Sequence, residues 1–239
     1  RGFIRDRDAL LKSVDADAVA RLSHPQWLID LVRQDWPDQA GQILEANNQR
    51  PPMWLRINLA RVSVADYLKL LEAEGLSAVA HPHAAAALRL ASAVDVSRLP
   101  GFSEGLVSVQ DAAAQLAAPL LDVKHGERVL DLCAAPGGKT CHILELTQNI
   151  DMTAVELQAV RMQRVQQNLE RLGLRAGLVV GDATDASAWW NSRPFDRILV
   201  DAPCSASGVI RRHPDIKSLR QPDDLAGQDV HGKGYRAAG

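Results

Sequence analysis

The sequence predicts an α/β fold with a doubly wound parallel sheet, on two observations. First, an apolar run at residues 129–132 leads through a turn of small residues into a helical run at 140–146. Second, the later apolar runs 152–156, 178–180 and 198–200 each end at a carboxylate or are closely followed by one. The carboxyl ends of parallel strands share one rim of such a sheet, where its ligands bind. We therefore expect a ligand site at that rim.

Before this sheet, the chain is expected to begin with helices. One starts after Pro25 and a second ends before Pro51 and Pro52, because proline lacks the amide hydrogen that continues a helix. Their apolar positions are Trp27, Leu28, Leu31 and Val32 in the first helix and Ala40, Ile43 and Leu44 in the second. A further helix at 64–74 has Ser63 as its cap and Gly75 at its end.

A strand with two unlike faces is expected at residues 54–59. Alternation places the apolar residues on one face and Trp54, Arg56 and Asn58 on the other. An aromatic ring, a guanidinium and an amide on one exposed face suit stacking and phosphate contacts with unpaired RNA. The alternative is a half-buried strand whose tryptophan packs under a neighbouring loop, and these residues alone leave both interpretations open.

The helices that flank the parallel strands are indicated by caps and spacing. A short strand at 106–109 precedes Asp111, which is placed to cap an alanine-rich helix that runs to Ala118. Between the second and third parallel strands, apolar residues recur at spacings of three and four, and Gly173 ends the series. These apolar residues are Met162, Val165, Leu169 and Leu172.

The turn at residues 133–139 could serve two kinds of nucleotide pocket. A P-loop needs glycine five positions before its Gly-Lys-Thr, but Cys133 stands there. The dinucleotide fingerprint also fails as a literal string, because Ala135 and Gly137 replace its first two glycines. What remains is the layout: strand, tight turn, helix, and then Glu156 as an acid that can bind a ribose diol.

Two further acids stand at the same expected rim as Glu156. Asp182 can accept a hydrogen bond from an adenine amine, and Asp201 follows the last parallel strand. For each acid taken alone, the alternative is a carboxylate that caps a helix or faces solvent.

Several segments together resemble the RsmB/NOP family of bacterial ribosomal-RNA cytosine-C5 methyltransferases. The segments are 45–58, 109–111, 130–140, 201–208 and 209–216, and the likeness covers about residues 1–220. The resemblance implies an incomplete Rossmann-like class I methyltransferase domain, preceded by a small helical and α+β RNA-binding segment. It also implies S-adenosylmethionine as cofactor and small-subunit (16S) ribosomal RNA as partner.

The resemblance divides the chain into four parts. Residues 1–24 are expected to be the remnant of a helical amino-terminal domain and its linker, and 25–102 the RNA-binding segment. Residues 103–220 are the expected S-adenosylmethionine-binding domain, and 221–239 an irregular tail. We expect the sequence to be shortened at both ends: at the amino end because it opens on Arg1 rather than methionine, and at the carboxyl end because the later strands of the family's domain are missing.

The resemblance also implies the cofactor site. Its residues would be Cys133, Ala134, Ala135, Pro136, Gly137, Gly138, Lys139, Glu156, Asp182 and Asp201. The family more often has Asp where this chain has Glu156, and either acid can bind a diol.

The family's reaction requires a cysteine. A thiolate must add to C6 of cytosine before C5 can take a methyl group. In the family this cysteine stands in a Thr-Cys motif on a later strand, while the cysteine of Pro-Cys, here Cys204, helps to release the product. Asp201 would bond the cytosine edge, and Lys139 would position the base or stabilise negative charge. The alternative for Cys204 is a buried, inert thiol, and the alternative for Lys139 is a side chain that faces solvent.

No cysteine follows Cys204, so the expected nucleophile is missing and the chain as written is expected to be inactive. Two other functions remain open, a P-loop NTPase and a catalytically silent RNA-binding fragment.

Composition limits the kind of protein. A net charge of −2 and a pI of about 6.4 argue against a strongly electrostatic nucleic-acid binder, so RNA contacts must come from local patches such as Arg211 and Arg212. Three cysteines without paired spacing indicate a reducing compartment. We expect a cytoplasmic protein without a membrane segment or a bound metal, and the oligomeric state is left open.

Overall fold

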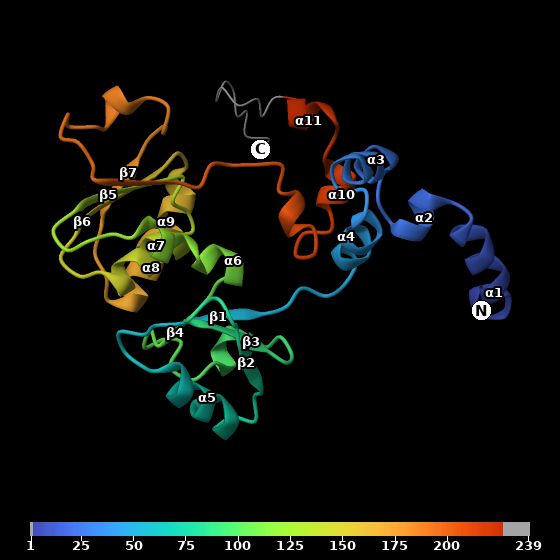
Figure 1. Cartoon of the computed structure of the whole chain (residues 1–239), viewed down its shortest axis with the longest axis horizontal. Coiled ribbons are helices and arrows are strands. Elements are labelled where there is room, and N and C mark those ends of the chain that lie inside the picture. Colours follow the sequence, from blue (N-terminus) through green and yellow to red (C-terminus); the bar gives the residue numbers. More distant parts are fainter. Residues whose placement is uncertain (1, 227–239) are drawn as a thin grey trace. The chain divides into compact units, whose positions relative to one another are not determined.

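The protein forms two compact units in a computed structural model that describes residues 2–226 (Figure 1). One unit consists of the described parts of Arg1–Pro51 and Pro203–Gly239, and the other is Pro52–Ala202. Among the described residues, no helix is both long and apolar enough to cross a membrane.

The first unit is helical. Its amino-terminal part contains α1 (Gly2–Asp15), α2 (Ala18–Leu22), α3 (Gln26–Asp35) and α4 (Ala40–Asn47). The helices expected after Pro25 and before Pro51 are confirmed as α3 and α4. They bury Leu28, Ile29 and Leu44.

The later part of this unit contains the short helices η3 (Ser207–Val209), α10 (Ile216–Leu219) and α11 (Asp223–Ala226). The tail expected to be irregular from residue 221 therefore begins with one helical turn, in which the Asp224 carboxylate accepts a hydrogen bond from the Gln221 amide. Residues 227–239 of that expected tail lie outside the described part of the chain.

The second unit begins with an antiparallel sheet in the order β2-β3-β1-β4. Its elements are β1 (Trp54–Ile57), α5 (Val64–Ala73), β2 (Ala78–Ala80), β3 (Ala87–Leu90), η1 (Val96–Arg98) and β4 (Val107–Val109). Ser63 caps α5 as predicted, because its hydroxyl accepts from the Asp66 amide. Strand β4 lies beyond the boundary expected at residue 102, yet it pairs with β1, so the first sheet extends past that boundary.

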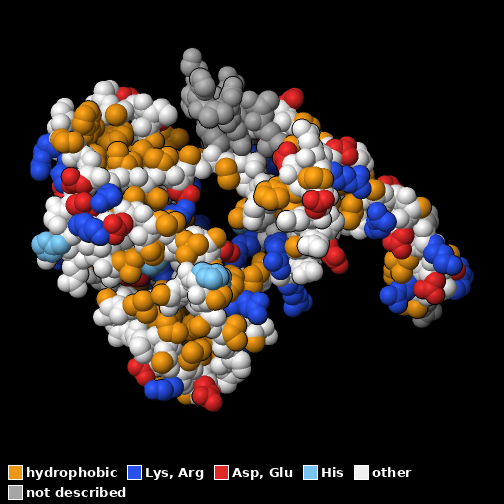
Figure 2. Space-filling model, in the orientation of Figure 1, with side chains coloured by type: hydrophobic (Ala, Val, Ile, Leu, Met, Phe, Trp, Pro, Cys, Tyr) orange, Lys and Arg blue, Asp and Glu red, His pale blue; other side chains and the backbone are white. Residues whose placement is uncertain are grey.

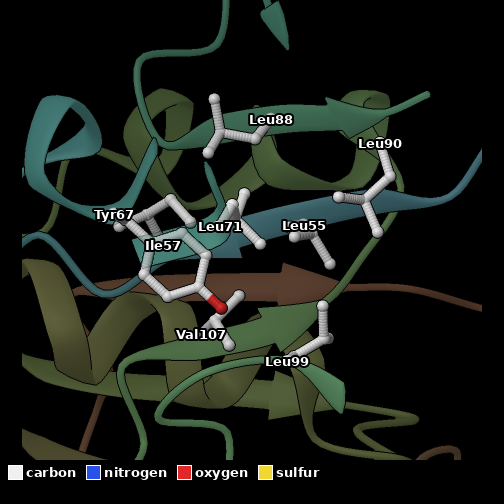
Figure 3. Packing of buried hydrophobic residues seen from close by; sticks show 8 residues of the cluster. All are labelled: Leu55, Ile57, Tyr67, Leu71, Leu88, Leu90, Leu99 and Val107. Atoms are coloured by element: carbon white, nitrogen blue, oxygen red, sulfur yellow. The ribbon is translucent and has the colours of Figure 1, made fainter. Parts of the chain in front are cut away.

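Helix α5 covers one face of this sheet with a closely packed apolar core (Figure 3). Tyr67 and Leu71 of α5 pack against every second residue of the neighbouring strands, such as Leu55 and Ile57 of β1. The buried cluster is Leu55, Ile57, Tyr67, Leu71, Leu88, Leu90, Leu99 and Val107. The side chain of β1 that lies between Leu55 and Ile57 therefore points to the opposite face.

A parallel sheet in the order β7-β6-β5-β8 forms the rest of the second unit. Its strands are β5 (Arg128–Leu132), β6 (Asp151–Glu156), β7 (Gly177–Val180) and β8 (Arg197–Val200), and its helices are α6 (Ala112–Gln115), α7 (Ala117–Leu121), α8 (Gly138–Leu146), α9 (Ala159–Leu172) and η2 (Ala186–Ala188). The predicted α/β fold with a Rossmann-like parallel sheet is confirmed. Instead of the single helix expected after Asp111, the chain forms two short helices, α6 and α7, which meet at Leu116.

Helices α7, α8 and α9 supply the core of the parallel sheet. Ala118 and Ile143 pack on Val129 and Met152, and the predicted apolar positions of α9 are buried. Gly173 ends α9 in the left-handed region, as expected. Ile198 and Val200 of β8, by contrast, are more than half exposed. Figure 2 shows hydrophobic side chains gathered over the part of the unit that carries this sheet.

Candidate cofactor site

The carboxyl ends of the four parallel strands lie at one rim of the sheet. Leu132 pairs with Val155 on one side and Val200 on the other, and Glu156 pairs with Val180. The segments that follow the strands are therefore neighbours. The structure brings together at this rim the turn 133–139, Glu156, Asp182 and Asp201.

The turn after β5 needs glycine at one position for a steric reason. Gly137 has φ +92°, and a Cβ atom there would lie 3.0 Å from Val165 Cγ1 and 3.1 Å from Val165 Cα. Cys133 also has positive φ, and the Ala135–Pro136 peptide bond is cis. The first hydrogen bond of α8 runs from the Cys141 amide to the Gly137 carbonyl, so the amides of its first turn precede the helical ladder and can face a ligand.

Helix α9 holds this turn in place through two polar side chains. Asn168 donates to the Pro136 carbonyl at 2.9 Å, and Arg161 donates to the Ala135 carbonyl at 3.1 Å. The sequence analysis singled out neither of these two residues. Their separation by two helical turns, which puts both on one face of α9, is the signal that could have found them.

Glu156 is the most buried acid of the rim, with 2% of its surface exposed. Its Oε1 accepts from the Gln158 amide and from Arg161, each at 3.2 Å. Its Oε2 has one long contact, to the Ala135 amide at 3.4 Å. A carboxylate offers about four acceptor positions, so Oε2 can still accept a hydroxyl.

Asp182 and Asp201 are more exposed than Glu156. Asp182 Oδ1 accepts from the Thr184 amide and hydroxyl, and these bonds lower the pKa of Asp182. The carboxylate is therefore ionised near neutral pH and remains an acceptor. Asp201 forms an ion pair with Lys139, the residue that follows Gly138 in the first turn of α8.

A further acid, Asp131, lies beneath the turn and was not singled out from the sequence. It is 1% exposed, its Oδ2 accepts from the Thr140 hydroxyl at 2.5 Å, and its Oδ1 has no partner among the described residues. Burial raises the pKa of Asp131 to about 6. Asp131 thus ties the last residues of β5 to the first turn of α8.

The two cysteines near the turn are poor nucleophiles. Burial raises the pKa of Cys133, with a further contribution from the Glu156 charge, and burial raises the pKa of Cys141 to about 12. Both are thiols rather than thiolates near neutral pH. Cys204 is exposed and lies in the part of the chain that belongs to the first unit.

The expectation that Trp54, Arg56 and Asn58 form an exposed face is wrong. Arg56 is 1% exposed and Asn58 is 3% exposed, because the second face of the antiparallel sheet is covered too. Asn58 donates to the Gly105 carbonyl and accepts from the Ala60 amide. Trp54 is half-buried against Ala84, Ala87 and Ala112 and contacts the His81 ring edge-on, as in the alternative interpretation.

Arg56 connects the antiparallel sheet to the helix that follows the turn. It donates to both carboxylate oxygens of Glu145, at 2.9 and 2.7 Å, and to the Gly138 carbonyl at 2.6 Å. A fourth bond, of 2.7 Å, reaches Gln110 Oε1. The bidentate pair with Glu145 is buried on both sides, and together with the bond to Gly138 it lets Arg56 hold both ends of α8.

The other two candidates for RNA contact lie in the first unit. Arg211 is half-buried and donates to the Arg50 carbonyl at 2.8 Å, while Arg212 is exposed. At least one hydrogen-bond donor of the Arg211 guanidinium is thus occupied by a protein acceptor.

Two family models match most of the chain. The model described as 16S rRNA methyltransferase RsmB/F matches residues 118–232. The one described as the ferredoxin-like domain of RsmF/B-like methyltransferases matches residues 24–97.

The chain is also similar to whole proteins. Ribosomal RNA small subunit methyltransferase B of Pseudomonas syringae pv. tomato is 52% identical over 95% of this chain and 51% of that protein. The protein of the same name from Vibrio cholerae is 50% identical over 95% of this chain and 52% of that protein. The chain spans about half the length of the curated relatives it matches.

Solved structures share the fold. A methyltransferase homologue from Pyrococcus horikoshii is 31% identical with a TM-score of 0.73, over 86% of this chain and 65% of that chain. NSun6 of the same organism is 19% identical with a TM-score of 0.74, over 85% of this chain and 76% of that chain, which supports the fold alone. With the two family models and the relatives taken together, the chain belongs to the RsmB/F family of 16S rRNA methyltransferases.

Proposed function

We propose that this chain is the S-adenosylmethionine-binding part of an enzyme that methylates C5 of a cytosine in small-subunit ribosomal RNA. The observation that carries the proposal is the rim of the parallel sheet, where the turn 133–139 and three carboxylates stand at the ends of neighbouring strands. Family membership supports methyl transfer to ribosomal RNA. The resemblance of residues 201–208 to the family motif supports cytosine as the target.

The residues of the rim fit this cofactor by their chemistry. Glu156 Oε2 has an acceptor position for a ribose hydroxyl, and the ionised Asp182 can accept from the adenine amine. The amides of the first turn of α8 face the polar end of a ligand. Arg161 now covers Glu156, with about half of its own side chain exposed, so binding would exchange this ion pair for the ribose diol.

S-adenosylmethionine, when bound, supplies a methyl group on a sulfonium. The protein must orient the cytosine and supply a thiolate for C6. The raised pKa values of Cys133 and Cys141 argue against either as that thiolate. We assign to Asp201 a hydrogen bond with the edge of the cytosine ring. Lys139 would hold Asp201 in position or stabilise negative charge on the base. Cys204 would help to release the product.

Calorimetric titration with S-adenosylhomocysteine tests this proposal. Glu156→Gln removes the charge and the Arg161 pair, so affinity should fall about 10- to 100-fold, or about 1–3 kcal/mol. Glu156→Asp keeps a carboxylate and should retain measurable binding. Glu170→Gln, at an exposed acid on α9 away from the rim, is the control and should bind as the unaltered chain does.

Two results would overturn the proposal. One is unchanged affinity in Glu156→Gln. The other is protection of the fold from heat by ATP but not by S-adenosylhomocysteine, which would favour an NTPase in spite of Cys133 at the position of the first P-loop glycine.

A further inference from the structure

A second candidate site lies in the helical unit, apart from the cofactor rim. A cavity of about 650 Å³ is lined by two stretches that are far apart in the sequence. One runs from Val19 in α2 into the first turn of α3 and includes His24 and Trp27. The other is α10 with the residues around it, and includes Lys217, Ser218 and Arg220.

Polar contacts hold the walls of this cavity in position. His24 Nδ1 lies 2.5 Å from the Leu22 carbonyl, and its Nε2 is 3.4 Å from Asn47 Nδ2, so both ring nitrogens have protein partners. The side chain of Asn48 joins the two stretches. Its Nδ2 donates to the Leu22 carbonyl, and its Oδ1 accepts from the Lys217 ammonium at 2.8 Å. The Lys217 ammonium is therefore held in one place.

Within the described residues 2–226, the lining of the cavity offers hydrogen-bond donors and includes no Asp or Glu. Its cations are Lys217 and Arg220. The bond to Asn48 uses one of the three Lys217 donors, so two remain for a ligand. In a chain of net charge −2, this is a local positive site that suits an anion.

An aromatic wall narrows the class of anion. Trp27 is half-buried and lines the cavity together with Pro25 and Val19. A flat apolar ring beside two cations suits a nucleotide, whose base can stack while its phosphate meets the cations. A peptide with acidic side chains would use the cations and leave the ring without a partner of matching shape.

We propose that this cavity binds one unpaired nucleotide of an RNA strand, with its phosphate on Lys217 and Arg220 and its base against Trp27. The identity of the strand as ribosomal RNA rests on the proposed function. The cavity lies within one unit and contains none of the cofactor residues, so the two sites can be tested separately.

The experiment measures binding of a short fluorescein-labelled single-stranded RNA by fluorescence anisotropy at several salt concentrations. For the double variant Lys217→Gln/Arg220→Gln, affinity should fall about tenfold or more at low salt. The slope of log K against log salt should decrease by about 0.7 for each phosphate that is no longer neutralised. Arg33→Gln, at a cation of α3 outside the cavity, is the matched control and should change affinity less than about twofold.

A second pair of variants separates stacking from packing. Trp27→Leu should weaken RNA binding about tenfold, while Trp27→Phe keeps an aromatic ring and should retain most of it. Circular dichroism on all variants checks that the unit folds, and a variant that fails this check is replaced by Trp27→Tyr. An equal loss of affinity in the Leu and Phe variants would overturn the stacking assignment.

The outcomes distinguish this proposal from the proposed function. No RNA binding by the unaltered chain, or equal losses of affinity in the cavity variants and Arg33→Gln, would overturn the nucleotide site. Titration with S-adenosylhomocysteine should be unchanged in every cavity variant. If the unaltered chain binds RNA but not S-adenosylhomocysteine, the cofactor proposal is overturned and the nucleotide site stands.

Discussion

The antiparallel and the parallel sheet of residues 52–202 carry their polar side chains in different places. In the antiparallel sheet, Arg56 stands within β1, and it donates to protein acceptors on three other residues. In the parallel sheet, Glu156 ends β6, while Asp182 and Asp201 follow β7 and β8. A polar group inside a strand that is covered on both faces must find its partners in the fold. A polar group beyond a strand end can keep acceptor positions for a ligand.

This difference also separates the two kinds of buried acid. Glu145 is buried and paired through both oxygens with a guanidinium, whereas Asp131 is buried next to a single hydroxyl. The pair of Glu145 with Arg56 should stabilise the fold at any pH near neutral, whereas Asp131 should make the stability depend on pH. The following predictions test these contrasts.

The largest effect is expected from breaking the Arg56–Glu145 pair. Arg56→Met should lower the free energy of unfolding by about 3–5 kcal/mol, because it leaves a carboxylate buried without its partner. Arg56→Met/Glu145→Met should recover much of this loss, since no unpaired charge remains. Urea denaturation followed by circular dichroism measures both.

The control for this prediction is Lys69→Gln, which breaks the exposed Lys69–Asp66 pair and should leave the denaturation midpoint unchanged. A loss of stability in Arg56→Met as small as that of the control would contradict the assignment of Arg56 to the interior.

A smaller effect, dependent on pH, is expected at Asp131. The folded protein holds the Asp131 proton up to a pKa of about 6, whereas the unfolded chain releases it near the ordinary pKa of 3.8. Stability should therefore decrease as pH rises through this window, by at most about 3 kcal/mol. Asp131→Asn cannot ionise, so it should lack this slope and be more stable than the unaltered chain above about pH 7.

Denaturation midpoints of both proteins, measured below about pH 4 and above about pH 7, check this prediction. Parallel pH profiles for the two proteins would show that Asp131 titrates alike in the folded and unfolded states.

The smallest effect is expected at the exposed acid of the rim. Asp182→Ala should weaken S-adenosylhomocysteine binding only a few-fold, because water can replace an exposed carboxylate, and the loss of affinity should be smaller than in Glu156→Gln. Asp185→Ala is the matched control, since Asp185 is also exposed and bonds a nearby hydroxyl. Equal affinity in Asp182→Ala and Asp185→Ala would remove Asp182 from the cofactor site.

Sequence reasoning located the rim because its determinants are local. Strand ends, the glycine turn, the Ser63 cap and the Gly173 stop each depend on a few neighbouring residues. Once the strands are parallel, their carboxyl ends must meet, so Glu156, Asp182 and Asp201 come together without further information.

The polar contacts that hold the site were not accessible in the same way. The alternation in β1 correctly separated Arg56 from Leu55 and Ile57, but what pairs with Arg56 on that face is Glu145, 89 residues later. Arg161 and Asn168 hold the turn from another helix, and the Asp131 carboxylate meets Thr140 of α8. Periodicity assigns a residue to a face, whereas only tertiary contacts decide whether that face meets solvent or protein.

Hydrogen–deuterium exchange with and without S-adenosylhomocysteine tests the assignment of the rim most directly. We expect the ligand to slow exchange in the amides of the turn 133–139 and the first turn of α8, and in those around Glu156 and Asp182. The amides of α5 and the antiparallel sheet should exchange at the same rate in both states. Slower exchange confined to other parts of the chain, or no change at saturating ligand, would contradict the placement of the cofactor at the rim of the parallel sheet.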